Sequence, residues 1–535
     1  MSPRAKNSFK PTHVFNCKKK ELNLLMVALI ISDKSLSWSD LSYLINSPGS
    51  LRLTQKTKKL IKTSNDALKT VLSKGDIVYG VNTGFGKLSS VPINKADIKQ
   101  LQLNLVRSHA AGLGKPFDNG IVRIVMALKI LTWAKGYSGV RPELVNQLIS
   151  MVNKDIIPLI PSLGSVGASG DLAPLAHLAC SMIGESNVSY KGKLISSKKA
   201  FNSAKIKLIE LEAKEGLSLI NGTQVSTAIG VKALFEAQNL LYSADIISAL
   251  SVEASLSSRQ VFNPAIHKLK KHKGQNVSAR NLYSLLSGSE IINSDKDFNK
   301  IQDPYCMRCI PHIHGSSWEA FLNTEKTINN EINSISDNPL IFPNGSIHNS
   351  GHFHAEPIAQ ALDSLSIAIS EIGAISERRI HYIMKGADGN LPMFGAVKSG
   401  LESGFMLPHV TAASLASENK TLAHPSSVDS ISTSGGQEDI VSMAPWAGRS
   451  CLKIIENVRR ILAIELLISG NINYRFHQKL SSSKSLKPLM SLLRQSKVLS
   501  KTDRVFAKDI ETVEGLIVTN KVFSIVNKIN KVSRI

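Results

Sequence analysis

A repeating apolar pattern is the feature that most narrows the folds open to this chain. Between residues 358 and 372, five aliphatic residues follow one another at alternating steps of four and three: Ile358, Leu362, Leu365, Ile369 and Ile372. This spacing places one apolar stripe along a helix and is typical of a long helix that packs along another. Residues 225–250 and 452–468 are also long and have broader apolar faces. The sequence therefore predicts a mainly α-helical protein with a central bundle of long helices.

The first third of the chain has a different pattern. Glycine and proline punctuate residues 79–92 and 156–170, which predicts loops there. Loops on a rigid scaffold often carry the chemistry of a protein. We therefore expect three parts within one continuous unit: a basic N-terminal tail (1–20), an N-terminal part with these loops (21–224), and the long-helix bundle with a C-terminal helical part (225–535).

A formal net charge of +23 raises the question of a nucleic-acid partner. The lysines lie in short scattered clusters, such as 18–20 and 267–274. Aromatic residues make up only 5% of the chain and are not interleaved with these clusters, as a base-stacking surface requires. We therefore expect no nucleic-acid partner.

Cysteine usage and the N-terminus indicate the compartment. Five cysteines in 535 residues are too few for a secreted disulfide framework and favour a reducing environment. The apolar run Leu24 to Ile31 follows lysines, as in a signal peptide, but it meets Asp33 and Lys34 at once and has no cleavage pattern. It is also too short to span a membrane. We expect a cytoplasmic protein without a membrane partner.

The stretch GSVGASGDLAPLA, residues 164–176, combines three glycines with other small residues. At Ala168-Ser169-Gly170, the backbone nitrogen of Gly170 can attack the carbonyl carbon of Ala168 and close a five-membered ring. Loss of water from the ring and from the Ser169 side chain then leaves a conjugated electrophile. A Cβ on residue 170 would obstruct this closure. Taken alone, the tripeptide is equally compatible with a flexible turn.

The surroundings of this tripeptide resemble the cyclising motif of the histidine and aromatic amino-acid ammonia-lyases, which form a 4-methylidene-imidazol-5-one (MIO) group. The resemblance continues in order along nearly the whole chain, through YGVNTGFG (79–86), NLVRSHAAGLG (104–114), EGLSLINGTQVSTA (215–228), QDPYCMRCIP (302–311), SDNPLIF (336–342), FHAEPIA (353–359), ASENKTLAHPSSVDSISTSGGQEDIVSMAP (416–445) and ENVRRILAIELL (456–467). It implies an MIO group formed by the chain from Ala168, Ser169 and Gly170, without a metal. It also implies a homotetramer in which neighbouring chains share active sites.

The resemblance assigns roles to the reacting groups. An amino group leaves poorly and a β-hydrogen is a weak acid, so elimination needs an electrophile and a base. Ser169 supplies the electrophile within the ring. Tyr79 is the first candidate for β-proton transfer, and Tyr305 is the second. A tyrosine with a pKa of about 10 needs a cationic or hydrogen-bonding neighbour to act near neutrality.

The same comparison implies substrate-binding residues. Arg308 matches the arginine that receives the substrate carboxylate, a role suited to its planar fork of donors. Asn221 and Gln302 match amides near the prosthetic group and the substrate, and Phe353 matches an apolar wall. Each of these polar residues, taken singly, is better explained by a structural hydrogen bond. Only the whole set of motifs, in the same order as in the family, favours a role in binding or catalysis.

Two residues point to the substrate. His109 in RSHAAG and Glu438 in GQEDIVSM resemble the histidine branch of the family. The Glu438 carboxylate, also a candidate catalytic group, can bind an imidazole, whereas a pocket for phenylalanine would leave it unpaired. We expect elimination of ammonia from L-histidine to give trans-urocanate, the first step of histidine degradation. A phenylalanine or tyrosine ammonia-lyase, a related aminomutase and a non-catalytic homologue are the alternatives.

The sequence departs from the family pattern beside Tyr305 and Arg308. It reads PYCMRCIPH where the family usually has PYSLRCQPQ, and His352 replaces a common asparagine. These changes and the basic charge are what suggest the non-catalytic alternative. Cys306 and Cys309, followed by His312 and His314, also resemble a zinc site, but no second cysteine pair accompanies them. We expect no metal.

Overall fold

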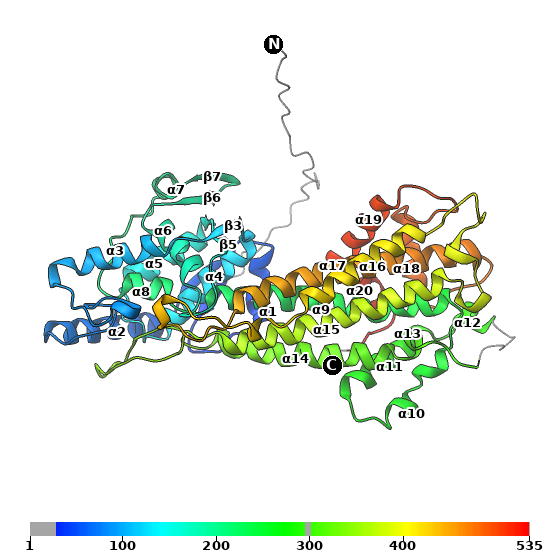
Figure 1. Cartoon of the computed structure of the whole chain (residues 1–535). Helices are drawn as coiled ribbons and strands as arrows, with labels where there is room; N and C mark the ends of the chain where they lie inside the picture. Colours follow the sequence, from blue (N-terminus) through cyan, green and yellow to red (C-terminus); the bar gives the residue numbers. More distant parts are fainter. Residues whose placement is uncertain (1–27, 295–300, 534–535) are drawn as a thin grey trace, which may run out of the picture.

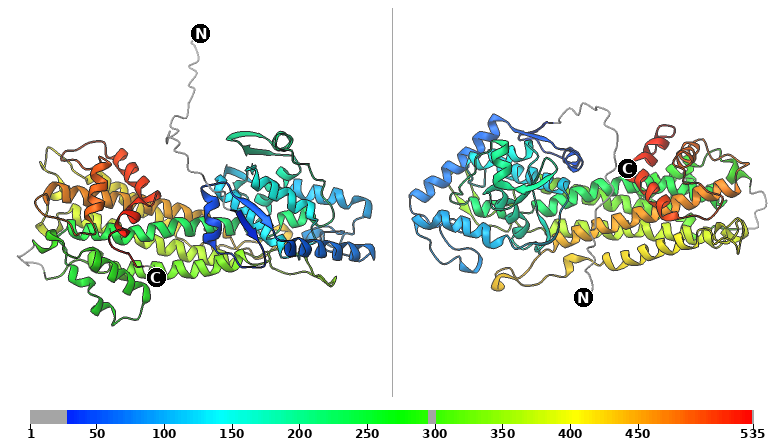
Figure 2. Two further views of the ribbon diagram at one scale, coloured as in Figure 1. Left: turned by 180° about the vertical axis from the view of Figure 1, so that it is seen from behind. Right: turned by 90° about the horizontal axis from the view of Figure 1, so that it is seen from above.

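A computed structural model describes residues 28–294 and 301–533, so the N-terminal tail predicted at 1–20 lies outside the described residues. The molecule is elongated (Figure 1), with the N-terminal part at one end and helices running from it to the other end. Two further views show the same arrangement (Figure 2). The mainly α-helical prediction is confirmed.

Four long helices form the centre of the molecule: α9 (Gln224–Ala254), α14 (Ile310–Ile332), α15 (Glu356–Met384) and α17 (Ala444–Phe476). Helix α15 packs against α14 and α17, and α17 packs against α9. The five aliphatic residues of the predicted stripe all lie on α15 and are fully buried. The three predicted long helices are therefore confirmed, while α14 was not predicted.

The N-terminal part is helical with small sheets. Its helices are α1 (Trp38–Ser42), α2 (Gln55–Ser73), α3 (Ile98–His109), α4 (Asn119–Ala134), α5 (Pro142–Asn153), α6 (Leu172–Met182), α7 (Ser197–Ala204) and α8 (Glu215–Ile220). Helix α4 is buried on nearly every side and packs against α9, which joins this part to the bundle.

Nine short strands form four small sheets. They are β1 (Ala28–Ile31) parallel to β2 (Ser50–Leu53); β3 (Leu113–Pro116) antiparallel to β5 (Pro161–Leu163); β4 (Ile157–Pro158), β6 (Asn187–Tyr190) and β7 (Lys193–Ser196) in one antiparallel sheet; and β8 (Leu340–Ile341) antiparallel to β9 (Ile347–His348) among the described residues. Strands β4 and β5 lie within 156–170, which the sequence predicts as a loop. They are too short for a periodic pattern to reveal them.

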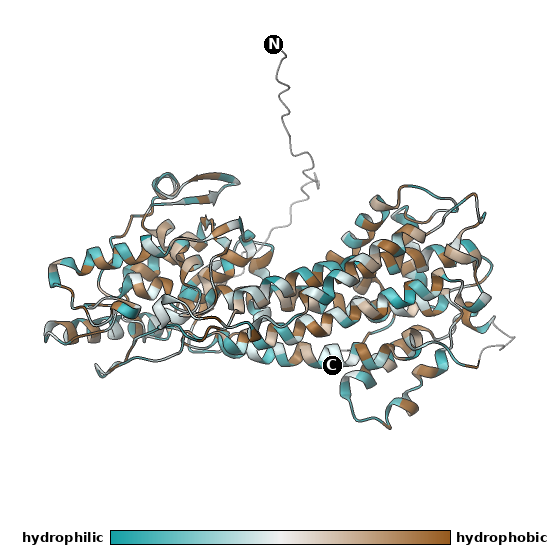
Figure 3. Ribbon diagram, viewed as in Figure 1, coloured by the Kyte–Doolittle hydropathy of each residue, from teal (hydrophilic) through white to brown (hydrophobic). Residues whose placement is uncertain are grey.

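The remaining helices cover the far end of the bundle: α10 (Pro264–His267), α11 (Lys273–Leu285), α12 (Glu290–Asn293), α13 (Tyr305–Arg308), α16 (Met406–Leu422), α18 (Lys487–Gln495), α19 (Phe506–Val518) and α20 (Lys521–Asn527). Helix α15 is the one described helix long and apolar enough to cross a membrane by length and composition alone. Its apolar stripe packs inside the bundle. The helices of the bundle alternate hydrophobic and hydrophilic faces (Figure 3).

Candidate active site

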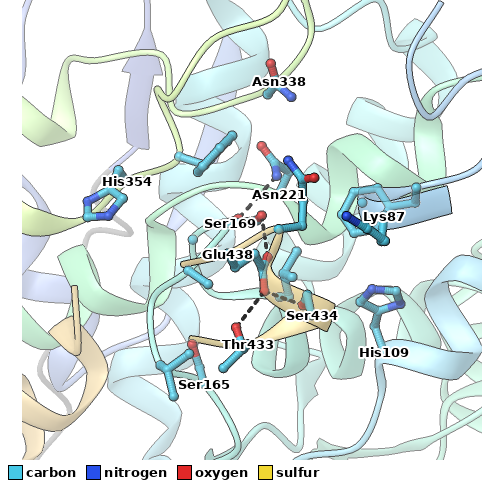
Figure 4. Close-up of a pocket in the computed structure, with 18 of the residues that line it drawn as sticks. Lys87, His109, Ser165, Ser169, Asn221, Asn338, His354, Thr433, Ser434 and Glu438 are labelled. Carbon is cyan, nitrogen blue, oxygen red and sulfur yellow. Dashed lines mark hydrogen bonds between the residues drawn. The ribbon is translucent and has the colours of Figure 1, made fainter. Parts of the chain in front are cut away.

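A cavity of about 980 Å³ opens in the N-terminal part of the molecule. Segments that are far apart in the sequence line it: 79–89, 164–173, 349–354 and 433–440, together with single residues such as His109 and Asn221. The segment 433–440 precedes α17, so the chain that leads into the bundle closes the cavity. Figure 4 shows the polar side chains that converge there.

The structure brings together most of the residues predicted from the sequence, but not all of them. Eight line the cavity: Tyr79, His109, Ala168, Ser169, Gly170, Asn221, Phe353 and Glu438. Gln302, Tyr305 and Arg308 do not line it. They lie on or beside α13, near the far end of the bundle (Figure 1).

The backbone at Gly170 has no space for a side chain. Gly170 has a φ of +76°, in the left-handed region that favours glycine. A Cβ at this position would lie 2.2 Å from the carbonyl oxygen of Gly222. The neighbouring Asp171 N–H donates to the same oxygen at 2.8 Å. The tripeptide is therefore pressed against the peptide that follows Asn221, and this arrangement fits a ring formed at residues 168–170.

Asn221 supplies a second observation that fits such a group. Its side-chain Nδ2 donates to the carbonyl oxygen of Ser169 at 3.2 Å. Its Oδ1 is buried and has no hydrogen-bond partner among the described residues. A buried acceptor without a partner is costly, so this atom is suited to a donor on a bound molecule beside the tripeptide.

Glu438 is fixed at the centre of the cavity by hydroxyl groups (Figure 4). Its Oε1 accepts a hydrogen bond from Ser169 Oγ at 2.7 Å. Its Oε2 accepts hydrogen bonds from the hydroxyls of Thr433, at 3.0 Å, and of Ser434. Thr433 and Ser434 were not predicted as site residues, although both lie in the STSGGQED stretch that carries part of the resemblance.

Tyr79 lies beside Phe85 at the cavity wall, with ring centroids 5.8 Å apart. Its hydroxyl oxygen accepts a hydrogen bond from the Gly86 N–H at 3.0 Å. Burial raises the pKa of Tyr79, and the nearby Glu438 carboxylate raises it further, while the Gly86 hydrogen bond lowers it. The net direction is opposite to the one that a base near neutrality needs.

His109 ends α3 and points toward the cavity. Its Nδ1 hydrogen-bonds with the Leu105 carbonyl oxygen at 2.8 Å, and its ring meets the Phe85 ring edge-on at 5.4 Å. Burial lowers the pKa of His109, while the Leu105 carbonyl and the Glu438 carboxylate raise it by less. The neutral imidazole therefore carries its proton on Nδ1 and presents Nε2 as an acceptor.

The three predicted residues at the far end, in contrast, are exposed or only partly buried. Tyr305 is 72% exposed, and Gln302 is also exposed. Arg308 donates from Nε to the Asp303 carbonyl oxygen at 2.7 Å and lies 5.1 Å from the Tyr305 ring centroid. These side chains share one short segment but contribute nothing to the cavity of their own chain.

The segment that resembles a zinc site has other contacts. His314 is buried, and its Nδ1 lies 2.8 Å from an Asp245 carboxylate oxygen. His312 lies against the His267 ring, with centroids 5.6 Å apart. Within residues 28–294 and 301–533, no three His, Cys, Asp or Glu side chains are arranged to hold a metal ion. The zinc alternative therefore has no ligand set in this part of the chain.

Comparison with known proteins identifies the relatives of the chain. Residues 36–495 match the family model described as aromatic amino acid lyase. A histidine ammonia-lyase of Vibrio cholerae is 44% identical over 494 residues, which cover 92% of this chain and 96% of the relative.

Two solved structures share the fold. A histidine ammonia-lyase from Trypanosoma cruzi matches with a TM-score of 0.86 and 36% identity, covering 94% of this chain and 95% of that one. A tyrosine aminomutase from Streptomyces globisporus matches with a TM-score of 0.87 and 29% identity, covering 94% and 99%. Similar TM-scores for proteins with different names mean that the fold alone does not identify the substrate.

Proposed function

The chain belongs to the aromatic amino acid lyase family and is a carbon–nitrogen lyase, and we propose that it eliminates ammonia from L-histidine to give trans-urocanate. The observation that carries the choice of substrate is the position of Glu438. Its carboxylate is fixed within the cavity, with Oε1 2.7 Å from Ser169 Oγ. The chain is 44% and 36% identical to the two relatives named histidine ammonia-lyase and 29% identical to the tyrosine aminomutase, which supports the same choice.

Glu438 and His109 suit an imidazole ring for complementary reasons. A carboxylate accepts a hydrogen bond from an imidazole N–H or pairs with an imidazolium. The neutral His109 presents an unprotonated Nε2 and adds no positive charge that would repel an imidazolium. In a cavity for phenylalanine or tyrosine side chains, the Glu438 carboxylate would face an apolar ring at a cost in desolvation.

The prosthetic group and its support come from the chain itself. An MIO group formed from Ala168, Ser169 and Gly170 supplies an electrophile for the substrate amino group, and the proposal needs no metal. The Asn221 amide donates to the Ser169 carbonyl oxygen, which remains as the ring carbonyl. Tyr79, which lines the cavity, is the first candidate to remove the β-proton, and Phe353 provides an apolar wall.

The far-end residues complete the site when chains assemble. Tyr305 is 72% exposed, and its helix α13 lies far from the cavity in the molecule. In the homotetramer that we propose, another copy brings Gln302, Tyr305 and Arg308 to the cavity. The guanidinium of Arg308 then receives the substrate carboxylate. Its positive charge also lowers the pKa of a nearby tyrosine, which corrects the unfavourable direction that Tyr79 has in the single chain.

We also propose that the enzyme is cytoplasmic, with no nucleic-acid or membrane partner. This rests on the few cysteines and on lysine clusters that lack interleaved aromatic residues.

The test is a parallel incubation of the purified protein with L-histidine, L-phenylalanine and L-tyrosine. We expect only histidine to be consumed, with ammonia and trans-urocanate released in equal amounts. Consumption of tyrosine or phenylalanine with histidine inert would overturn the proposed substrate. A β-amino acid formed without ammonia would identify an aminomutase. An intact mass equal to that encoded, instead of two waters less, together with inactivity toward all three, would identify a non-catalytic homologue.

A further inference from the structure

Lys129 is a fully buried lysine behind the tripeptide that the proposed reaction does not use. It lies on α4 and has no exposed surface. Its Nζ donates to the carbonyl oxygens of Asn221, at 2.7 Å, and Ser218, at 3.0 Å. Both acceptors belong to the C-terminal end of α8, where helix carbonyls have no partner within the helix and favour a cation.

The carbonyl held by Lys129 belongs to the Asn221–Gly222 peptide, and these two residues contact Ser169, Gly170 and Asp171. Next to this carbonyl, the Asn221 side chain donates to the Ser169 carbonyl oxygen at 3.2 Å. The following residue, Gly222, occupies the space where a Cβ of Gly170 would stand, with its nitrogen 2.8 Å from that position. The Gly222 carbonyl oxygen accepts the Asp171 N–H at 2.8 Å. Any shift of the Asn221–Gly222 peptide therefore alters the contacts of residues 169, 170 and 171 together.

The surroundings of Lys129 make burial of its ammonium group unfavourable for the stability of the fold. The other buried lysine of this region, Lys214, is paired with the Asp337 carboxylate at 2.8 Å. Among the described residues, Lys129 has no carboxylate within ion-pair distance. Its hydrogen bonds go to two carbonyl groups, and its Nζ lies 6.0 Å from the Trp133 ring centroid. Burial lowers the pKa of Lys129 to about 7. An ammonium group buried without a paired carboxylate is normally unfavourable, so its retention at this point calls for a specific role.

We propose that Lys129 is a positioning residue for formation of the prosthetic group, a proposal that rests on the proposed function. By holding the Asn221 carbonyl, it fixes the Asn221–Gly222 peptide against the tripeptide and keeps the Gly170 nitrogen close to the Ala168 carbonyl carbon. In the step that it supports, a bond forms between these two atoms. The Ala168 carbonyl oxygen leaves as water with the protons of the Gly170 and Ser169 nitrogens, and a double bond forms between the Ala168 carbonyl carbon and the Ser169 nitrogen.

A second water then leaves from the Ser169 side chain. It consists of the Ser169 hydroxyl and the proton on the Ser169 Cα, and it leaves a carbon–carbon double bond between Cα and Cβ. Neither step changes the overall oxidation state, and neither requires an oxidant or another reactant. The structure assigns Lys129 to holding the backbone in place and assigns no proton transfer to it.

The test compares the intact masses of purified wild type, Lys129→Met and Lys214→Met. Both variants delete one buried lysine amine, and Lys214→Met also removes the ion-pair partner of the Asp337 carboxylate, but only Lys129 contacts the Asn221 carbonyl. We expect wild type and Lys214→Met to be two waters lighter than the encoded chains. We expect most Lys129→Met chains to keep one or both waters, while circular dichroism shows a helix content equal to that of wild type.

A charge-balanced variant keeps the test decisive where Lys129→Met alone does not fold. Lys129→Met combined with Asp337→Asn removes one buried charge of each sign. It also takes the Asp337 carboxylate from Lys214, and Asp337→Asn alone, which has the same loss, is its control. Retained water in the double variant, but not in its control, supports the proposal. Complete loss of two waters in a folded Lys129 variant overturns it and leaves the proposed function intact. A wild-type chain at its full encoded mass would overturn both.

Discussion

The cavity end and the far end of the molecule carry two groups of predicted site residues in opposite environments. At the cavity, Ser169, Asn221 and Glu438 are connected by hydrogen bonds within one chain. At the far end, Tyr305 points to solvent, and Arg308 is held by a backbone carbonyl. Under the proposed function, a single chain therefore orders the groups for the electrophile and for the imidazole ring. The proposed residues for the substrate carboxylate would come from another copy.

The tyrosines show the same contrast. Tyr79 is largely enclosed, and burial raises its pKa, whereas Tyr305 is exposed beside an arginine. Neither tyrosine combines enclosure with a neighbouring cation in the single chain. Bringing the two ends together would supply both conditions to one phenol, so the assembly is expected to control the chemistry as well as the shape of the site.

The largest loss of activity is expected when one functional group is removed at either end of the molecule. Ser169→Ala, at the cavity, and Arg308→Ala, at the far end, are each expected to lower the rate by at least about 10³-fold. Mixed tetramers made by co-expressing the two variants should regain activity in about one site in four, because some cavities with an intact Ser169 then meet an intact Arg308. The measurement is the rate of urocanate formation by the purified mixed tetramers.

The control for this experiment mixes two variants of the same end. Ser169→Ala with Asn221→Ala leaves every cavity with one defect, so no activity should return. Equal recovery in both mixtures, or none with Arg308→Ala, would mean that the two ends do not combine in one site.

An intermediate effect is expected within the cavity end. Glu438→Gln removes the negative charge while keeping the side-chain size. It should lower kcat/KM for histidine about 100-fold, because the imidazole loses a charge-assisted hydrogen bond where charge develops. Asp429→Asn, an exposed acid of the neighbouring loop, is the matched control and should change kcat/KM little. Similar values for both variants would remove the basis for choosing histidine.

The smallest expected effect concerns the pH dependence of stability at the cavity end. Burial lowers the pKa of His109, so below its ordinary pKa of about 6.5 the unfolded chain binds more protons than the folded one. Its contribution to stability is present above that pH and is lost as the pH falls through the folded-state value. Urea unfolding of His109→Gln should therefore show a weaker loss of stability than wild type between about pH 7 and pH 5. His348→Gln, at the surface, should behave like wild type.

Much of the local structure was predictable because its signals are local. The stripe from Ile358 to Ile372 repeats at helical spacing, and that spacing alone requires a buried face. By contrast, α14 carries Pro311, His312, His314 and Gly315 near its start, which are poor helix formers, and β4 and β5 span only two and three residues. Their formation depends on neighbours that come from elsewhere in the chain, so no pattern within the segment reveals them.

The same distinction applies to the site. The small residues at 168–170 indicate a backbone that closes on itself, and the ordered motifs identify the family. Thr433, Ser434 and Lys129 were not recognised, because hydroxyl groups in a loop and a lysine in an apolar helix have no pattern of their own. Their importance lies in contacts with Glu438 and Asn221 that packing creates.

The sequence alone predicted that the protein is built on long helices and that three small residues could close into an electrophile. Both follow from properties of adjacent residues: side-chain spacing along a helix, and the absence of a Cβ at Gly170. The tertiary structure was needed to show that Glu438 meets Ser169 across 269 residues of sequence, and that α13, which carries Arg308, lies far from the cavity in the molecule. Such long-range contacts and distances depend on how rigid helices pack, which is a property of the whole chain that no short segment encodes.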